Sequence, residues 1–109
     1  MVVSEMTKEI TTMTKQATKI QNTLRKNTTY EVKFICERKV SKKTYYQFVI
    51  IQFDSIRAVV TISEEEKFIP SVIPQFELWQ FNNLESFFLD TLFNNVQSSI
   101  KELNKVDAE

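Results

Sequence analysis

A ladder of apolar residues at the start of this 109-residue chain constrains its fold more than any other feature of the sequence. The apolar positions follow one another at intervals of three and four residues, which is the a/d spacing by which a helix buries one narrow stripe. They are Val3, Met6, Ile10, Met13, Ala17, Ile20 and Leu24. The spacing predicts a coiled-coil-like helix over residues 3–26, within an N-terminal segment 1–27.

Two partners would suit this stripe. A strict a/d stripe is narrower than the one that a helix usually buries on a sheet, so the pattern favours contact with a helix of a second chain through all seven residues. Packing on the sheet of the same domain is the alternative. Threonine is a weak helix former, and residues 3–26 contain six threonines, so we expect the helix to need one of these partners.

Two residue types are missing from the whole chain. Without glycine, the Gly-rich loops that cradle phosphates and the dinucleotide-binding fingerprint are absent, because both need backbone conformations that glycine supplies. Without histidine, the usual general base near pH 7 is absent, and a zinc site is excluded because there is only one cysteine. We therefore expect no enzyme activity, no metal, no cofactor and no small-molecule substrate.

Charge is unevenly distributed, although the chain as a whole is neutral. Residues 1–29 contain five basic and two acidic residues, a net charge of +3, so the remainder carries −3. Nucleic-acid binding through this basic arm is an alternative function, but the rest of the chain lacks the basic stripe that duplex-binding proteins use. No apolar run is long enough to span a bilayer, so no membrane association is expected.

The cysteine content bears on the compartment. Cys36 is the only cysteine, so no intramolecular disulfide can form, and the polar, Thr-rich N-terminus does not read as a secretory signal. This combination favours a reducing compartment, either nucleus or cytoplasm. Cys36 itself is predicted to be a small core residue.

Alternating patterns predict a sheet in the middle of the chain. Residues 30–37 alternate as a half-buried strand, residues 44–53 are apolar on both faces and predict a central strand covered on both sides, and residues 56–62 predict a third strand. Residues 68–74 contain two prolines, which cannot lie in a sheet interior. Residues 75–81 are predicted to return as a fourth strand or an extended segment.

The last predicted helix runs from Leu84 to Lys105, after a capping box of Asn82 and Glu85. At 100° per residue, most of its apolar residues fall within one arc of roughly 140°, the face that should cover the sheet: Phe88, Leu89, Leu92, Phe93, Val96, Ile100 and Leu103. The expected fold class is therefore α+β. It comprises an N-terminal helix and, over residues 28–109, an antiparallel sheet of three or four strands with the C-terminal helix packed on one face.

The order of three strands, a Pro-x-x-x-P segment, a further strand and a helix resembles the RWD family, the non-catalytic relatives of ubiquitin-conjugating enzymes. The matching residues are Ile69-Pro70-Ser71-Val72-Ile73-Pro74, in which Ile69 stands where the family has tyrosine, and the resemblance covers residues 28–105. Conjugating enzymes carry a His-Pro-Asn stretch and a nucleophilic cysteine downstream of this motif. This chain has neither beyond Pro74, so the resemblance implies an RWD-like domain without that activity.

A coiled-coil arm that leads into a single RWD-like domain is similar to the globular ends of kinetochore proteins. The resemblance implies a protein-interaction module that forms a homo- or heterodimer through its N-terminal helix and docks a partner peptide or helix. The implied context is kinetochore assembly, chromosome segregation and the cell cycle, in the nucleus. An RWD-type adaptor in ubiquitin or stress-kinase signalling is the alternative.

Several side chains are candidates for surface roles. Phe87 falls opposite the buried arc of the last helix, so it is the favoured partner-binding residue outside the N-terminal ladder. Trp79 and Phe81 either join it on a partner surface or fill the core. The lysines at 39, 42 and 43 either contact acidic groups or, as favoured, form a solvated hairpin tip. The glutamates at 64–66 are predicted to be a solvated loop.

Overall fold

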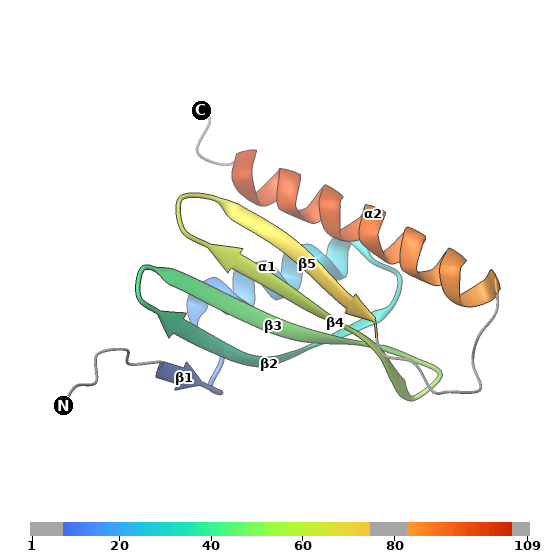
Figure 1. Cartoon of the computed structure of the whole chain (residues 1–109), viewed down its shortest axis with the longest axis horizontal. Coiled ribbons are helices and arrows are strands. Elements are labelled where there is room, and N and C mark those ends of the chain that lie inside the picture. Colours follow the sequence, from blue (N-terminus) through green and yellow to red (C-terminus); the bar gives the residue numbers. More distant parts are fainter. Residues whose placement is uncertain (1–7, 75–82, 106–109) are drawn as a thin grey trace.

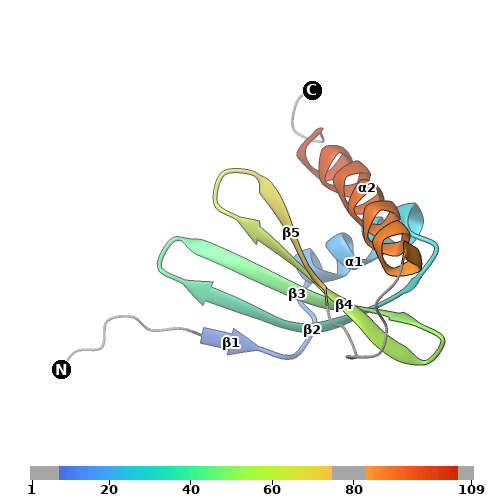
Figure 2. The same cartoon turned by 45° about the vertical axis from the view of Figure 1, so that its right-hand side comes forward.

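The computed structural model describes residues 8–74 and 83–105. Its elements are β1 (Lys8–Ile10), α1 (Lys15–Asn27), β2 (Glu31–Val40), β3 (Lys43–Gln52), β4 (Ser55–Glu64), β5 (Phe68–Pro74) and α2 (Asn83–Lys105). The strands form one antiparallel five-stranded sheet in the order of the sequence. Both helices lie on the same side of this sheet, with α1 against β2 and α2 against β5 (Figures 1 and 2). The α+β class is confirmed, but the prediction of three or four strands is wrong, because residues 8–10 and the proline segment 68–74 each add an edge strand.

The predicted helix over residues 3–26 is wrong for the described residues before Lys15. Residues 8–10 form β1, in which Ile10 lies opposite Glu37 of β2, and the helix begins only at Lys15. Thr14 is the N-cap: its hydroxyl accepts from the Ala17 N–H at 3.2 Å and donates to the buried Glu37 carboxylate at 2.7 Å. Cap residues compete with the helix interior for backbone hydrogen bonds, so the threonine-rich stretch starts the helix late.

The second half of the ladder packs within its own chain. Ala17, Ile20 and Leu24 have no exposed surface, and they share one core with α2 and with the sheet. Met13 and Ile10 are half-buried, while Val3 and Met6 lie outside the described residues. Helix α1 therefore packs on β2, as the alternative of packing on its own sheet predicts, and it also contacts α2 of the same chain.

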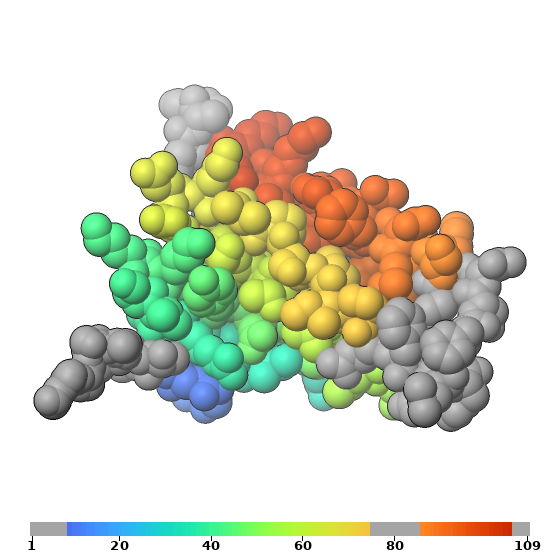
Figure 3. All heavy atoms as spheres, viewed as in Figure 1, coloured from blue at the N-terminus to red at the C-terminus, as the bar shows by residue number. Residues whose placement is uncertain are grey.

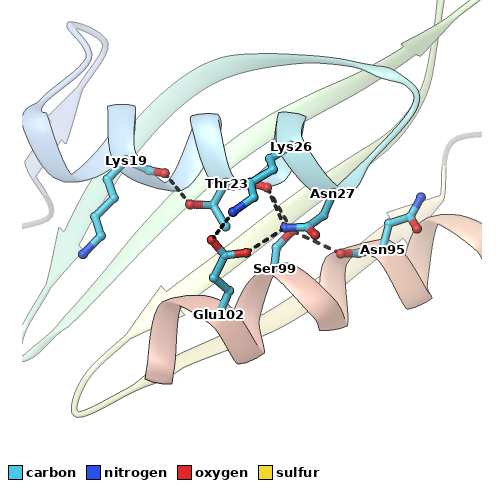
Figure 4. A network of polar contacts seen from close by, with 7 residues as sticks. All are labelled: Lys19, Thr23, Lys26, Asn27, Asn95, Ser99 and Glu102. Carbon is cyan, nitrogen blue, oxygen red and sulfur yellow. Dashed lines mark hydrogen bonds and ion pairs between the residues drawn. The ribbon is translucent and has the colours of Figure 1, made fainter. Parts of the chain in front are cut away.

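Polar contacts fasten α1 to α2 at the end of α1 (Figure 4). Lys26 and Asn27 both reach Glu102: the ammonium lies 2.9 Å from one carboxylate oxygen, and the Asn27 amide donates to the other at 3.3 Å. The carbonyl of Thr23 accepts from Asn27 at 3.0 Å and from the buried Ser99 hydroxyl at 3.3 Å. These contacts leave the last turn of α1 hydrogen-bonded, and we call them the helix clasp.

The core lies between the sheet and the two helices. Phe48 and Ile50 of β3 and Val60 and Ile62 of β4 are fully buried on the side that the helices cover. The prediction that β3 is covered on both sides is wrong for the described residues, because both helices lie on one side. The alternate residues of β3, such as Val49, are only partly buried. The β3 sequence is thus more apolar than its observed surroundings require.

Most of the remaining predicted elements correspond to an observed strand or helix. The strands at 30–37, 44–53 and 56–62 correspond to β2, β3 and β4, and the last helix is α2. The Pro70 and Pro74 segment is itself a strand, β5, at the edge of the sheet, where a missing N–H is tolerated. The strand predicted at 75–81 lies outside the described residues, as do Trp79, Phe81 and the Asn82 cap.

The predicted buried arc of α2 is largely confirmed. Phe88, Leu92, Val96, Ile100 and Leu103 are buried, and Leu89 is packed against the core. Phe93, predicted to be buried, is 43% exposed. Phe87 is 67% exposed, as its position opposite the arc predicts.

Candidate functional site

Carboxylates and one thiol are the potential metal ligands of the described ranges. No group of three or more Asp, Glu or Cys side chains within residues 8–74 and 83–105 is arranged to hold a metal ion. The Cys36 thiol is buried and donates to the Gln47 amide oxygen at 3.4 Å. Burial, together with hydrogen bonding to Glu9, raises the pKa of Cys36, so the thiol is protonated at neutral pH and is a poor nucleophile.

No helix in the described part of the chain is both long enough and apolar enough to cross a membrane.

The side of the sheet away from the helices, which we call the open face, is uncovered by any described element (Figure 3). Residues opposite one another in neighbouring strands share a face, so the register identifies its members. Towards the β2–β3 turn the face is polar, with Gln47, Thr61 and Ser71 in one row. Towards the β3–β4 turn it is apolar, with Val49, Val59 and Ile73 in one row and Ile51 and Ile56 in the next.

Side chains of α2 close the outer edge of β5. Asn104 accepts from the Phe68 N–H at 2.8 Å and donates to the Phe68 carbonyl at 3.0 Å. Backbone groups alternate along an antiparallel strand, so Pro70, Val72 and Pro74 have the same outward orientation as Phe68. The two prolines have no N–H, which leaves Val72 as the donor that this edge can offer to another strand.

Side chains of α1 close the opposite edge in the same way. Beyond the stretch that pairs with β1, the outer edge of β2 presents the Val32 carbonyl and the Phe34 N–H. The Arg25 guanidinium donates to the Val32 carbonyl at 2.9 and 3.1 Å, and the Gln21 amide oxygen accepts from the Phe34 N–H at 3.0 Å. The hydrogen bonds at Phe68, Val32 and Phe34, together with the two prolines of β5, close part of each edge, so addition of a strand from another protein is disfavoured at these positions.

An aromatic pocket lies where the β3–β4 turn meets the start of α2. Its volume is about 200 Å³, and its lining residues are Tyr30, Gln52, Phe53, Arg57, Phe87 and Phe88. The Arg57 guanidinium lies 5.3 Å from the centre of the Phe88 ring, and the Tyr30 ring centre lies 4.8 Å from it. Phe53 is 84% exposed, so the pocket has one aromatic wall that projects into solvent.

The turn that carries Phe53 is strained. Phe53 and Asp54 are the two central residues between Gln52 and Ser55, with φ of 54° and 60°. Both angles positive is the pattern of a type I′ turn, which favours Asn-Gly or Asp-Gly. A bulky residue in this region is rare and costs about 1 kcal/mol, because its Cβ crowds the backbone.

The structure therefore brings together a different set of residues from the predicted one. Of the predicted partner-binding residues, Phe87 lines the aromatic pocket, whereas Ala17, Ile20 and Leu24 lie in the core. Phe53 was not predicted as a site residue, because the strands predicted at 44–53 and 56–62 place it at a strand end and leave only residues 54 and 55 to connect them. The available signal was a hairpin connection without glycine, which requires some other residue to adopt positive φ.

Comparison of the chain with family models, with curated proteins and with solved structures found no match.

Proposed function

We propose that this chain is a non-enzymatic protein-interaction module that docks an apolar helix or peptide of a partner protein on its open face. The observation that carries the proposal is the sequence of β3. Its Phe48-Val49-Ile50-Ile51 run is apolar on both faces, as in strands that are buried on both sides, yet the described helices cover one side.

The neighbouring strands extend the same apolar surface. Ile73 of β5 is 49% exposed, and Ile56 at the start of β4 is 51% exposed. Scattered apolar side chains are ordinary on a protein surface, but these belong to adjoining strands on one face, and contiguous apolar patches mark interaction sites. Burial of this patch would contribute about 25 cal/mol for each Å² of apolar surface removed from water.

The chemistry of the described residues supports binding over catalysis. The one thiol is buried and protonated at neutral pH, and the chain has no histidine to activate a hydroxyl or thiol nucleophile. The mechanism proposed is therefore burial of apolar side chains, with no bond made or broken.

The biological context remains a proposal from the family resemblance alone. If the chain is an RWD-type module, kinetochore assembly in the nucleus is the first context to test, and adaptor roles in ubiquitin or stress-kinase signalling are the alternative. Dimerisation through the N-terminal ladder would have to use the residues before α1, because Ala17, Ile20 and Leu24 are already buried within the chain.

Paired surface variants test the proposal. Ile73→Asp places a charge on the open face, and Gln97→Asp places the same charge on an exposed position of α2. Partners that co-purify with the tagged chain from its native cells are quantified by mass spectrometry, after circular dichroism has shown that each variant folds. The proposal expects a protein partner that is lost at least about tenfold with Ile73→Asp and retained with Gln97→Asp. Equal retention by both variants would refute it.

A further inference from the structure

We infer that Phe53 is the principal binding residue of this module, and that the aromatic pocket beside it takes one apolar side chain from a basic segment of the partner. The inference rests on the proposed function, because it assigns a specific anchor to the partner that the open face is proposed to bind. Ile51 and Ile56, the open-face pair closest to the turn, lie within three residues of Phe53, so the two surfaces adjoin.

The size of the pocket limits what can fill it. Sites for whole small molecules measure roughly 300–1,000 Å³, whereas this pocket measures about 200 Å³. A volume of that size suits a single large side chain, and the energetically dominant residues of protein interfaces are apolar or aromatic anchors seated in such pockets. Three of the four rings that line it are phenylalanines, which offer no hydrogen bond to a polar ligand.

The conformation of Phe53 argues that its side chain is retained for binding. In this free chain the residue has two unfavourable properties, since its ring is 84% exposed and its φ is 54°. Neither property stabilises the folded domain, and glycine or asparagine would adopt the same backbone conformation at lower cost. Strain of this kind concentrates at ligand-binding positions, where the side chain gains in the complex what it costs in the free protein.

The charges around the pocket favour a basic partner. Two exposed carboxylates adjoin its lining residues: Asp54 follows Phe53 in the turn, and Asp90 lies one helical turn after Phe87. The described cations nearby are already engaged, since Arg57 lies against the Phe88 ring and Arg25 donates to the Val32 carbonyl. A segment with an apolar anchor between lysines or arginines would complement this acidic rim.

Two asparagine substitutions separate binding from folding. Phe53→Asn relieves the backbone strain and removes the ring, while Ser41→Asn makes the same change at the β2–β3 turn, where Ser41 has φ of 60°. We expect both variants to keep or raise the melting temperature, by up to about 5 °C. Phe53→Gly is the second variant at this position. A fall in melting temperature with both Phe53 variants would show a structural role for the ring and overturn the inference.

The binding probe is a phage-displayed library of twelve-residue peptides, selected against the full chain. Selected peptides are synthesised and titrated by fluorescence anisotropy at low and high sodium chloride. We expect an apolar residue flanked by lysine or arginine, affinity that falls as salt is raised, a loss of at least about tenfold with Phe53→Asn, and no change with Ser41→Asn.

Three outcomes would overturn the inference: enrichment of acidic peptides, affinity of Phe53→Asn within twofold of the unmodified chain, or no peptide above background. None of these decides whether the open face binds a partner, because the Ile73→Asp co-purification tests that face separately. A failure of the pocket is thus distinguishable from a failure of the proposed function.

Discussion

The two faces of the sheet carry similar strand sequences but have different surroundings. In β4, Val60 points to the helices and is fully buried, whereas the adjacent Val59 points to the open face and is only partly buried. The covered face is closed by α1, α2 and the helix clasp, all from the same chain. Apolar character in these strands therefore does not by itself show which face is buried in the core. The positions of α1 and α2 determine which face is covered.

The edges of the sheet resemble the covered face and differ from the open one. Asn104 at one edge, and Arg25 with Gln21 at the other, satisfy backbone groups that would otherwise recruit a foreign strand. A domain with closed edges can present an apolar face with less risk of edge-to-edge association.

A charge placed in the core should destabilise the chain far more than the same charge placed on the open face. Ile20→Asp buries an unpaired charge in the core and should cost about 4 kcal/mol or more, most of the stability of a typical domain. Ile73→Asp makes the same change on the open face and should alter the free energy of unfolding by less than about 1 kcal/mol. Urea unfolding of both variants measures the difference. Unfolding of Ile73→Asp would mean that this face also belongs to the core of the chain.

A smaller effect concerns the closed edge. Asn104→Ala leaves the Phe68 N–H and carbonyl without their side-chain partners and should cost about 1–3 kcal/mol. Gln97→Ala, at an exposed position of the same helix, is the matched control. Thermal unfolding gives the stabilities, and light scattering at rising concentration shows whether the uncovered edge promotes association. Equal stability of the two variants would mean that Asn104 does not close the edge.

The smallest effect concerns the pH dependence of the helix clasp. Hydrogen bonding to the Lys26 ammonium, and then to Asn27, lowers the pKa of Glu102 below its ordinary value of 4.5. A carboxyl whose pKa is lower in the folded state stabilises the fold above pH 4.5, and this contribution is lost as the pH falls through the lowered value. Glu102→Gln should therefore lower the melting temperature slightly at pH 7 but not at pH 2. If Glu102→Gln lowered the melting temperature equally at pH 7 and pH 2, the charge of Glu102 would not be the cause of the effect.

Much of the fold was predictable because local patterns determine it. Strands β2, β3 and β4 alternate over stretches long enough to specify a sheet, and the apolar arc of α2 specifies the helix that covers it. The N-terminal ladder predicted too long a helix, because intervals of three and four residues show only where apolar groups recur and not which backbone conformation carries them. Its first described part, around Ile10, finds its hydrogen bonds with β2 instead of in a helix, and the register between distant segments is not a local property.

The candidate site was predictable only in part. Phe87 was identified from its angle on the last helix, because helix geometry is local. Phe53 required the exact pairing of Gln52 with Ser55, since a shift of the turn by one residue would return the ring to a strand face. Predicting which face of the sheet is open requires knowing where α1 packs, and the position of α1 depends on its contacts with α2 more than on its own sequence.

The helix clasp also has a consequence for the order in which the domain is completed. The sheet is a succession of neighbouring hairpins, whose contacts close short loops and form early. The clasp instead joins residues 75 and 76 positions apart, so its loop-closure cost is met only when α2 has been made. During synthesis, the sheet and α1 therefore wait for α2. Until α2 arrives, the part of the covered face that it occupies is exposed to water like the open face, and only α1 distinguishes the two.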